Sequence, residues 1–184
     1  MSEQSTKPFD RSYWVVPGRF LAGYFPGDKD RAAAEAKLRR LLDCGIRCII
    51  NLMREYELDD DGLPFAPYDG EFRRLAAERG VAVTCLRMPI RDLHIPTRET
   101  MRQILDAVDE CIAAGRPVYV HCWGGVGRTG TVVGCWLARH GLATGDAVLT
   151  RIDQLRQGDV GRRARPSPET EVQRQFVRSW QPRE

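Results

Sequence analysis

The stretch of sequence that decides the fold reads Val118-Tyr119-Val120-His121-Cys122-Trp123-Gly124-Gly125-Val126-Gly127-Arg128-Thr129-Gly130. It begins as a short apolar run, which is typical of a buried strand. Three glycines follow within four residues, and a helical pattern begins at Arg128. A strand that passes through a glycine-rich turn into a helix indicates an α/β sheet. Ligands of such sheets bind beyond the carboxyl ends of the strands, so we expect functional residues directly after Val120.

Apolar runs and amphipathic segments alternate along the rest of the chain. Strands are predicted at 13–16, 19–22, 46–52, 81–88 and 116–121. Helices are predicted from 28 or 30 to 42, and at 69–79, 97–114, 129–140, 144–157 and 168–180. The alternation predicts a central, mostly parallel sheet of about four to five strands flanked by helices. The length of 184 residues suits a single domain, 1–184, with a flexible N-terminus at 1–8.

Charge and hydropathy argue against several kinds of partner. With 28 basic and 25 acidic residues, the net charge of +3 is too small to indicate nucleic-acid binding. No apolar run approaches the roughly 20 residues that span a bilayer, and the N-terminus lacks the apolar segment of a secretory signal. We therefore expect a cytoplasmic protein with no membrane and no nucleic-acid partner.

Charged clusters and cysteines add less information. Acidic residues gather at Glu55, Glu57, Asp59, Asp60 and Asp61, and basic residues at Arg162, Arg163 and Arg165. Both patterns are typical of solvated loops. The six cysteines and three histidines show no metal-ligand spacing, so the sequence predicts no metal site and favours a reducing compartment.

The glycine-rich turn has the properties of an anion-binding loop. Its glycines allow a tight turn in which successive backbone N–H groups point inward, and the helix N-terminus adds further donors. Such surroundings favour a thiolate at the base of the loop, where Cys122 lies. The planar fork of Arg128 suits two phosphate oxygens. Thr129 is placed to donate a hydrogen bond to the Cys122 sulfur.

This segment resembles the signature loop of the cysteine-dependent protein tyrosine phosphatase superfamily, in which His-Cys is followed by five residues, Arg, and Ser or Thr. The resemblance implies the fold of a compact dual-specificity phosphatase and a metal-independent phosphatase without a cofactor. It implies that Cys122 is the nucleophile. The backbone of Trp123, Gly124, Gly125, Val126 and Gly127 would bind phosphate together with Arg128. His121 is expected to pack under the loop rather than to act as a base.

A second catalytic group is predicted in the loop Pro89-Ile90-Arg91-Asp92-Leu93-His94-Ile95-Pro96. A leaving alkoxide or phenolate needs a proton, so a general acid should lie above the phosphate. The segment resembles the acid loop of dual-specificity phosphatases, which implies that Asp92 is the acid, with His94 as the alternative. Cys122 then attacks phosphorus while Asp92 protonates the leaving oxygen, and water activated by the same carboxylate hydrolyses the phosphocysteine.

The last predicted helix carries a third candidate. The segment from Arg165 to Val177 resembles the part of several compact family members whose glutamine lies near the active site. Gln173 is the matching residue, which implies that it positions the hydrolytic water; a surface position is the alternative. Ser167 or Thr170 is expected to cap this helix.

The sequence indicates the substrate less clearly than it indicates the reaction. The leading hypothesis is a phosphorylated protein, with phosphotyrosine first and phosphoserine or phosphothreonine next. A phosphoinositide or an RNA 5′ phosphate, a non-catalytic phosphate-binding module and rhodanese-like sulfur transfer are the alternatives. The loop contains no lysine, which disfavours a phosphoinositide, although the arginines at 162–165 would supply positive charge if the fold brings them near the loop. Trp123 departs from the smaller or polar residue usual in the family, so we expect it to shape the pocket mouth.

Overall fold

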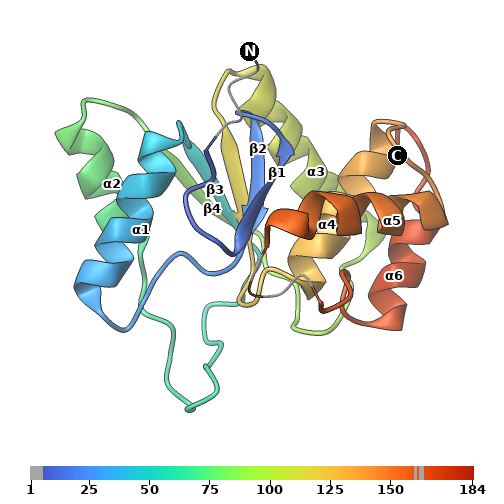
Figure 1. The fold of residues 1–184 in the computed structure, drawn as a ribbon, viewed down its shortest axis with the longest axis horizontal. Helices are drawn as coiled ribbons and strands as arrows, with labels where there is room; N and C mark the ends of the chain where they lie inside the picture. The colour runs from blue at the N-terminus through green and yellow to red at the C-terminus, as the bar shows by residue number, and fades with distance from the viewer. Residues whose placement is uncertain (1–5, 160, 162–163) are drawn as a thin grey trace.

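A mixed sheet forms the centre of this computed structural model, which describes residues 6–159, 161 and 164–184 (Figure 1). Within these residues the sheet has five strands in the order β1-β2-β5-β3-β4. They are β1 (Ser12–Val16), β2 (Phe20–Gly23), β3 (Cys48–Asn51), β4 (Thr84–Arg87) and β5 (Val118–His121). Only the pairing of β1 with β2 is antiparallel. The predicted fold class is therefore confirmed.

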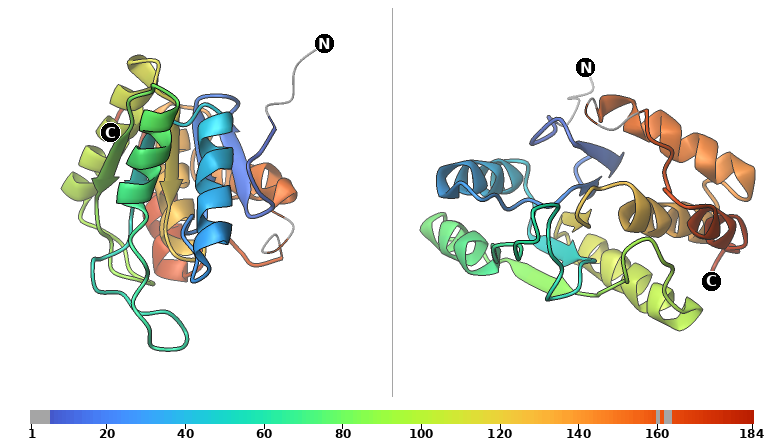
Figure 2. Two further views of the ribbon diagram at one scale, coloured as in Figure 1. Left: turned by 90° about the vertical axis from the view of Figure 1, so that its left-hand side faces the viewer. Right: turned by 90° about the horizontal axis from the view of Figure 1, so that it is seen from below.

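Helices cover both faces of the sheet (Figures 1 and 2). One face carries α1 (Arg31–Asp43) and α2 (Asp69–Glu78). The other carries α3 (Arg98–Ala113), α4 (Gly127–Arg139), α5 (Asp146–Leu155) and α6 (Glu171–Arg178). A short 3-10 turn, Arg156–Gly158, continues α5. None of the helices in the described ranges is long and apolar enough to cross a membrane.

Side-chain caps explain where several helices begin. Asp30 accepts a hydrogen bond from the Ala33 N–H, and Thr97 accepts one from the Thr100 N–H, so α1 and α3 start where the sequence predicts. The last helix is shorter than the predicted 168–180. Thr170 and Gln173 form a capping box there, which fixes the start of α6 at Glu171.

The central strand sets the position of the functional edge. All four residues of β5 are buried, and both neighbouring strands, β2 and β3, run parallel to it. His121 is in register with Gly23 of β2 and with Asn51 of β3. The segments that leave β2, β3 and β5 therefore emerge side by side at one edge of the sheet. The segment at 52–67, which follows β3, projects beyond this edge (Figure 1).

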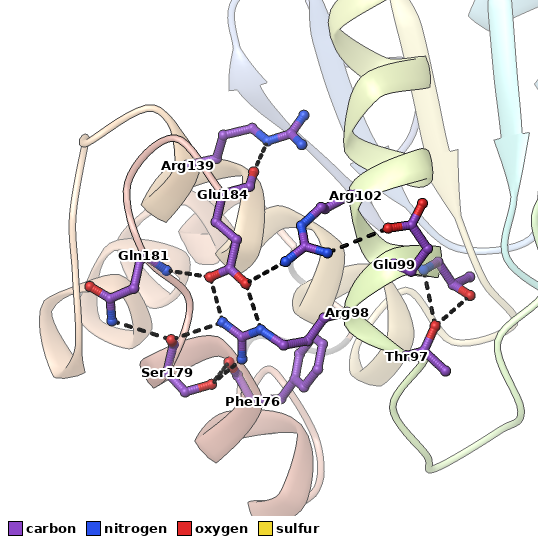
Figure 3. A network of polar contacts seen from close by, with 10 residues as sticks. Thr97, Arg98, Glu99, Arg102, Arg139, Phe176, Ser179, Gln181 and Glu184 are labelled. Atoms are coloured by element: carbon purple, nitrogen blue, oxygen red, sulfur yellow. Dashed lines mark hydrogen bonds and ion pairs between the residues drawn. The ribbon is translucent and has the colours of Figure 1, made fainter.

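A polar network fastens the end of the chain to α3 (Figure 3). The Glu184 carboxylate binds the side chains of Arg98 and Arg102, at the start of α3. The main-chain oxygen of Glu184 accepts a hydrogen bond from Arg139 Nε, in α4. Arg98 also donates to the Ser179 side chain at 3.2 Å. Because α3 begins just after the 89–96 loop, this network fixes the point at which that loop ends.

Helix α4 is the most enclosed helix, since the residues from Gly127 to Ala138 are all buried. Gly134 lies where α4 meets α6. A Cβ atom at this position would come within 2.6 Å of Val177 Cγ1 and 3.2 Å of Ile152 Cδ1. The close approach of α6 to α4 therefore depends on the missing side chain at Gly134.

We predict opposite effects for two glycine substitutions in helices. Gly134→Ala should lower the free energy of unfolding by about 1–3 kcal/mol, because the added methyl group forces α4 and α6 apart. Gly70→Ala in α2 is the matched control, since a Cβ atom at Gly70 would meet nothing within 4 Å. It should raise stability by about 0.5 kcal/mol. Urea denaturation measures both; a stabilising Gly134→Ala would contradict the packing described.

Candidate active site

The loop at 122–127 is held open by bonds to its carbonyl groups. The Trp123 oxygen accepts from the Phe25 N–H at 3.0 Å, and the Gly124 oxygen accepts from Arg11 at 3.1 Å. The Val126 oxygen accepts from the Ser167 hydroxyl at 2.7 Å. With these carbonyls tied to groups outside the loop, the N–H groups of residues 123–129 have no acceptor among the described residues. They form an anion-binding nest at the N-terminus of α4.

Gly125 is required by both conformation and space. Its φ of +72° lies in the left-handed region, and a Cβ atom would come within 2.6 Å of the Gly23 carbonyl carbon. The loop thus packs directly on the end of β2, and only glycine fits.

Cys122 lines a cavity of about 210 Å³. The Thr129 hydroxyl donates a hydrogen bond to its sulfur at 3.1 Å, as the sequence suggested. The cavity is lined by Asp60, Asp92, Leu93, Cys122, Trp123, Gly124, Gly127, Arg128, Arg165 and Glu169. The structure thus brings the predicted nucleophile, acid and arginine to one cavity.

His121 supports the loop from below. Its Nε2 lies 2.6 Å from the Tyr68 hydroxyl, and its Nδ1 lies 3.2 Å from the Cys122 main-chain oxygen. Burial lowers the pKa of His121 to about 3. The ring is therefore neutral near neutral pH, with Tyr68 donating to Nε2 and Nδ1–H donating to the Cys122 oxygen. This arrangement fits a structural role of His121 under the loop rather than a role as a base.

Arg128 is buried and held by two carboxylates. Glu57 binds it with both oxygens, at 2.6 Å from Nη1 and 3.0 Å from Nη2. Asp92 Oδ1 lies 2.9 Å from Nη2, and the Ile90 oxygen accepts from Nη1 at 3.2 Å. The Nε atom of Arg128 is buried and has no partner in the described part of the chain. Glu57 thus fixes the plane of the guanidinium, while Nε remains available as a donor.

Glu57 is a candidate functional residue that the sequence did not reveal. The acidic cluster around it is typical of a solvated loop, yet the Glu57 side chain is only 11% exposed. The available signal was its place after β3, because a segment leaving β3 emerges beside the segment leaving β5. The expectation of a solvated loop is met by Asp61, which is exposed and pairs with Lys29 at the surface.

The loop that carries Asp92 continues along the edge of β3. The Met88 N–H donates to the Asn51 oxygen, and the Ile90 N–H donates to the Leu52 oxygen, both at 2.9 Å. Leu93 adopts a φ of +61°, which turns the chain directly after Asp92. His94 lies outside the cavity lining, and its Nδ1 is 2.7 Å from the Asp92 main-chain oxygen. Of the two acid candidates, Asp92 is the one that lines the cavity.

Gln173 lies beside the loop rather than in the cavity. Its amide oxygen accepts from the Thr170 N–H, and its amide nitrogen donates to the His94 oxygen, both at 3.1 Å. A Cβ atom on Gly127 would be 3.1 Å from the Gln173 amide. Gln173 therefore connects α6 to the Asp92 loop, and its role in positioning water stays a prediction.

The basic cluster of the sequence lies partly at the cavity. Arg165 lines it and forms an ion pair with Glu169 at 2.8 Å. Arg162 and Arg163 lie outside the described residues. Ser167 is used to hold the Val126 oxygen, and Thr170 is the residue that caps α6.

We predict that Glu57→Gln lowers kcat/KM for an aryl phosphate by about tenfold to hundredfold. The variant loses the charged, two-point contact that orients Arg128, and small displacements of a phosphate-binding group are costly. Glu55→Gln is the matched control, because Glu55 is exposed and forms no ion pair in the described ranges. Steady-state kinetics measure both. Equal activity of Glu57→Gln and the native protein would show that Arg128 needs no carboxylate partner.

Comparisons with known proteins identify several relatives. An uncharacterized protein of Methanocaldococcus jannaschii, MJECL20, is 42% identical over 65 residues, which is 35% of this chain and 44% of that protein. The triple specificity protein phosphatase PtpB of Mycobacterium tuberculosis is 32% identical over 130 residues, 64% of this chain and 46% of that protein. The chain spans about half the length of the curated relatives that it matches first.

The fold also matches a solved structure. The structure of PTPMT1 in complex with PI(5)P superimposes with a TM-score of 0.69 over 93% of this chain and 94% of that chain, at 20% identity. A family model described as polymorphic toxin system, DSP-PTPase phosphatase matches residues 26–142, a range that holds Asp92, Cys122 and Arg128. The chain belongs to this family of cysteine-dependent phosphatases.

Proposed function

We propose that the protein hydrolyses phosphotyrosine in protein substrates, with phosphoserine and phosphothreonine as further substrates, through a phosphocysteine on Cys122. The observation that carries the proposal is that Cys122, Asp92 and Arg128 line one cavity, while the buried Nε of Arg128 has no partner among the described residues. A donor in such surroundings is costly without an acceptor, and a phosphate oxygen supplies one.

Binding of the phosphate would rearrange the contacts of Arg128. One phosphate oxygen accepts from Nε, and a second replaces Asp92 at Nη2, while Glu57 keeps its hold on the other side. The nest of N–H groups at 123–129 binds the remaining charge. Asp92 is thereby released toward the oxygen that leaves.

The reaction then follows in two balanced steps. Once phosphate has displaced it from Arg128, the Asp92 carboxylate takes up a proton from water. The Cys122 thiolate attacks phosphorus, the bond to the leaving oxygen breaks, and that oxygen takes the proton from Asp92. Water next attacks the phosphocysteine and gives a proton to the Asp92 carboxylate. The P–S bond breaks, and the thiolate is restored with the Thr129 hydroxyl donating to it.

The charges around the cavity support a substrate with a single phosphate. Apart from Arg128, the described lining holds one cation, Arg165, and it is paired with Glu169. Asp60 lines the same cavity and adds negative charge. Trp123 and Leu93 offer apolar surface suited to a phenyl ring.

A phosphoinositide is the second candidate, since a similar fold is known in complex with PI(5)P. The additional phosphates of a phosphoinositide would need unpaired cations, and besides Arg128 the described residues that line the catalytic cavity offer only Arg165, which is paired with Glu169. This charge distribution favours a protein substrate. The cytoplasmic location expected from the sequence stays a prediction.

We predict that the loss caused by Asp92→Asn depends on the leaving group. Hydrolysis of a phosphotyrosine peptide should fall about 100-fold or more, because its phenolate needs a proton. Hydrolysis of p-nitrophenyl phosphate should fall much less, since p-nitrophenolate leaves more easily. Cys122→Ser should abolish both activities.

His94→Asn tests the alternative acid. A loss as large as that of Asp92→Asn would move the proton donor to His94. Tight binding of phosphopeptide by the native protein without any turnover would instead support a binding module. A higher kcat/KM for a phosphoinositide than for every phosphopeptide would refute the protein substrate.

A further inference from the structure

A second cavity lies next to the catalytic one. Its volume is about 420 Å³, and it shares Trp123 and Asp60 with the cavity that holds Cys122. When a phosphorylated side chain of a substrate lies in the catalytic cavity, the second cavity therefore offers room for a neighbouring residue of the same substrate. The second cavity is lined by the segment after β2 and the segment after β3, together with Arg11, Lys37 and Trp123.

Aromatic rings form one side of this cavity. Trp123 packs edge to face on Phe65, with ring centroids 5.5 Å apart. Phe65 packs in the same way on Phe25, at 4.8 Å. Phe25 is fixed in turn by its backbone hydrogen bond to the Trp123 oxygen. The rings thus form a wall that is continuous with the signature loop.

The cations of this cavity already have partners. Lys29 pairs with Asp59 and Asp61, at 2.8 and 2.6 Å. Lys37 pairs with Asp28 at 2.8 Å. Arg11 donates to the Gly124 oxygen, and its guanidinium lies 4.2 Å above the centre of the Tyr24 ring. A second phosphate group would therefore have to displace existing contacts to bind here.

Among the aspartates that line this cavity, Asp60 has no cationic partner in the described part of the chain. It lines both cavities and is exposed, and no ion pair joins it to another residue of the described ranges. The cavity lining counts four aspartates, Asp28, Asp59, Asp60 and Asp61, against three cations, Arg11, Lys29 and Lys37. The charge left over in this cavity is negative and centred on Asp60.

We infer that this second cavity binds a basic side chain, an arginine above all, that lies next to the phosphotyrosine of a protein substrate. The inference rests on the proposed function and adds the sequence preference of the same site. The aliphatic stem of arginine packs on the aromatic wall, and its guanidinium stacks on a ring while it binds Asp60. Trp123 then divides the two cavities and contacts both the phosphotyrosine and the basic residue.

The test compares phosphotyrosine peptides that differ at one position. Arginine, glutamine or glutamate is placed at each of the two positions before and after the phosphotyrosine, and kcat/KM is measured by phosphate release. At the best position the native protein should favour arginine over glutamine by about fivefold, the size expected for one partly exposed ion pair with a stacking contact. Added salt should reduce this preference.

Two aspartate variants test whether the arginine preference depends on Asp60. Asp60→Asn should bring the arginine and glutamine peptides to equal kcat/KM. Because both peptides are compared on the same variant, any effect of the lost charge on catalysis cancels in the ratio. Asp61→Asn is the matched control, because Asp61 already pairs with Lys29, and it should keep the arginine preference.

Each other outcome overturns the inference. An absent arginine preference, an equal loss in both aspartate variants, or a preference for glutamate would each exclude a cation site at Asp60 while leaving the protein phosphatase intact. A lack of turnover with every peptide, alongside activity on p-nitrophenyl phosphate, would refute the proposed protein substrate and this inference together.

Discussion

The buried guanidinium of Arg128 is the constraint on which the site depends. A guanidinium removed from water is stable only when carboxylates and carbonyls satisfy it. Here Glu57 comes from the segment after β3, Asp92 and the Ile90 oxygen come from the loop after β4, and Arg128 lies in the first turn of α4. One side chain thus holds three separate segments in a single arrangement around the Cys122 sulfur.

The same arrangement explains how phosphate binding and acid catalysis would be linked. Asp92 occupies a donor of Arg128 that a phosphate oxygen also needs. The substrate therefore competes with the acid for Arg128, and the displaced carboxyl is left beside the leaving oxygen. Glu57 has no such competitor, because its two-point contact uses the outer edge of the fork. Both carboxylates contact Nη2, but only Glu57 also binds Nη1, so displacement of Asp92 leaves Glu57 bound.

Local patterns predicted much of this structure, and contacts across the fold were harder to predict. The strand, the glycine turn and the helix around Cys122 follow from adjacent residues, and so do the caps at Asp30 and Thr97. The contact of Glu57 with Arg128 joins residues 71 positions apart and depends on β3 lying beside β5. Local charge alone indicated only a solvated loop there. The packing of Phe65 on Trp123 has the same origin, since spacing in the sequence carries no sign of it.

The central claim is that Cys122 carries the phosphate between the two steps. It is tested most directly by quenching the protein in acid during turnover of a phosphotyrosine peptide and locating the phosphate by peptide mass spectrometry. We predict a phosphate on the Cys122 sulfur that forms before free phosphate is released and is absent in Cys122→Ser. Turnover without any phosphorylated Cys122, or with the phosphate on a different residue, would contradict this account.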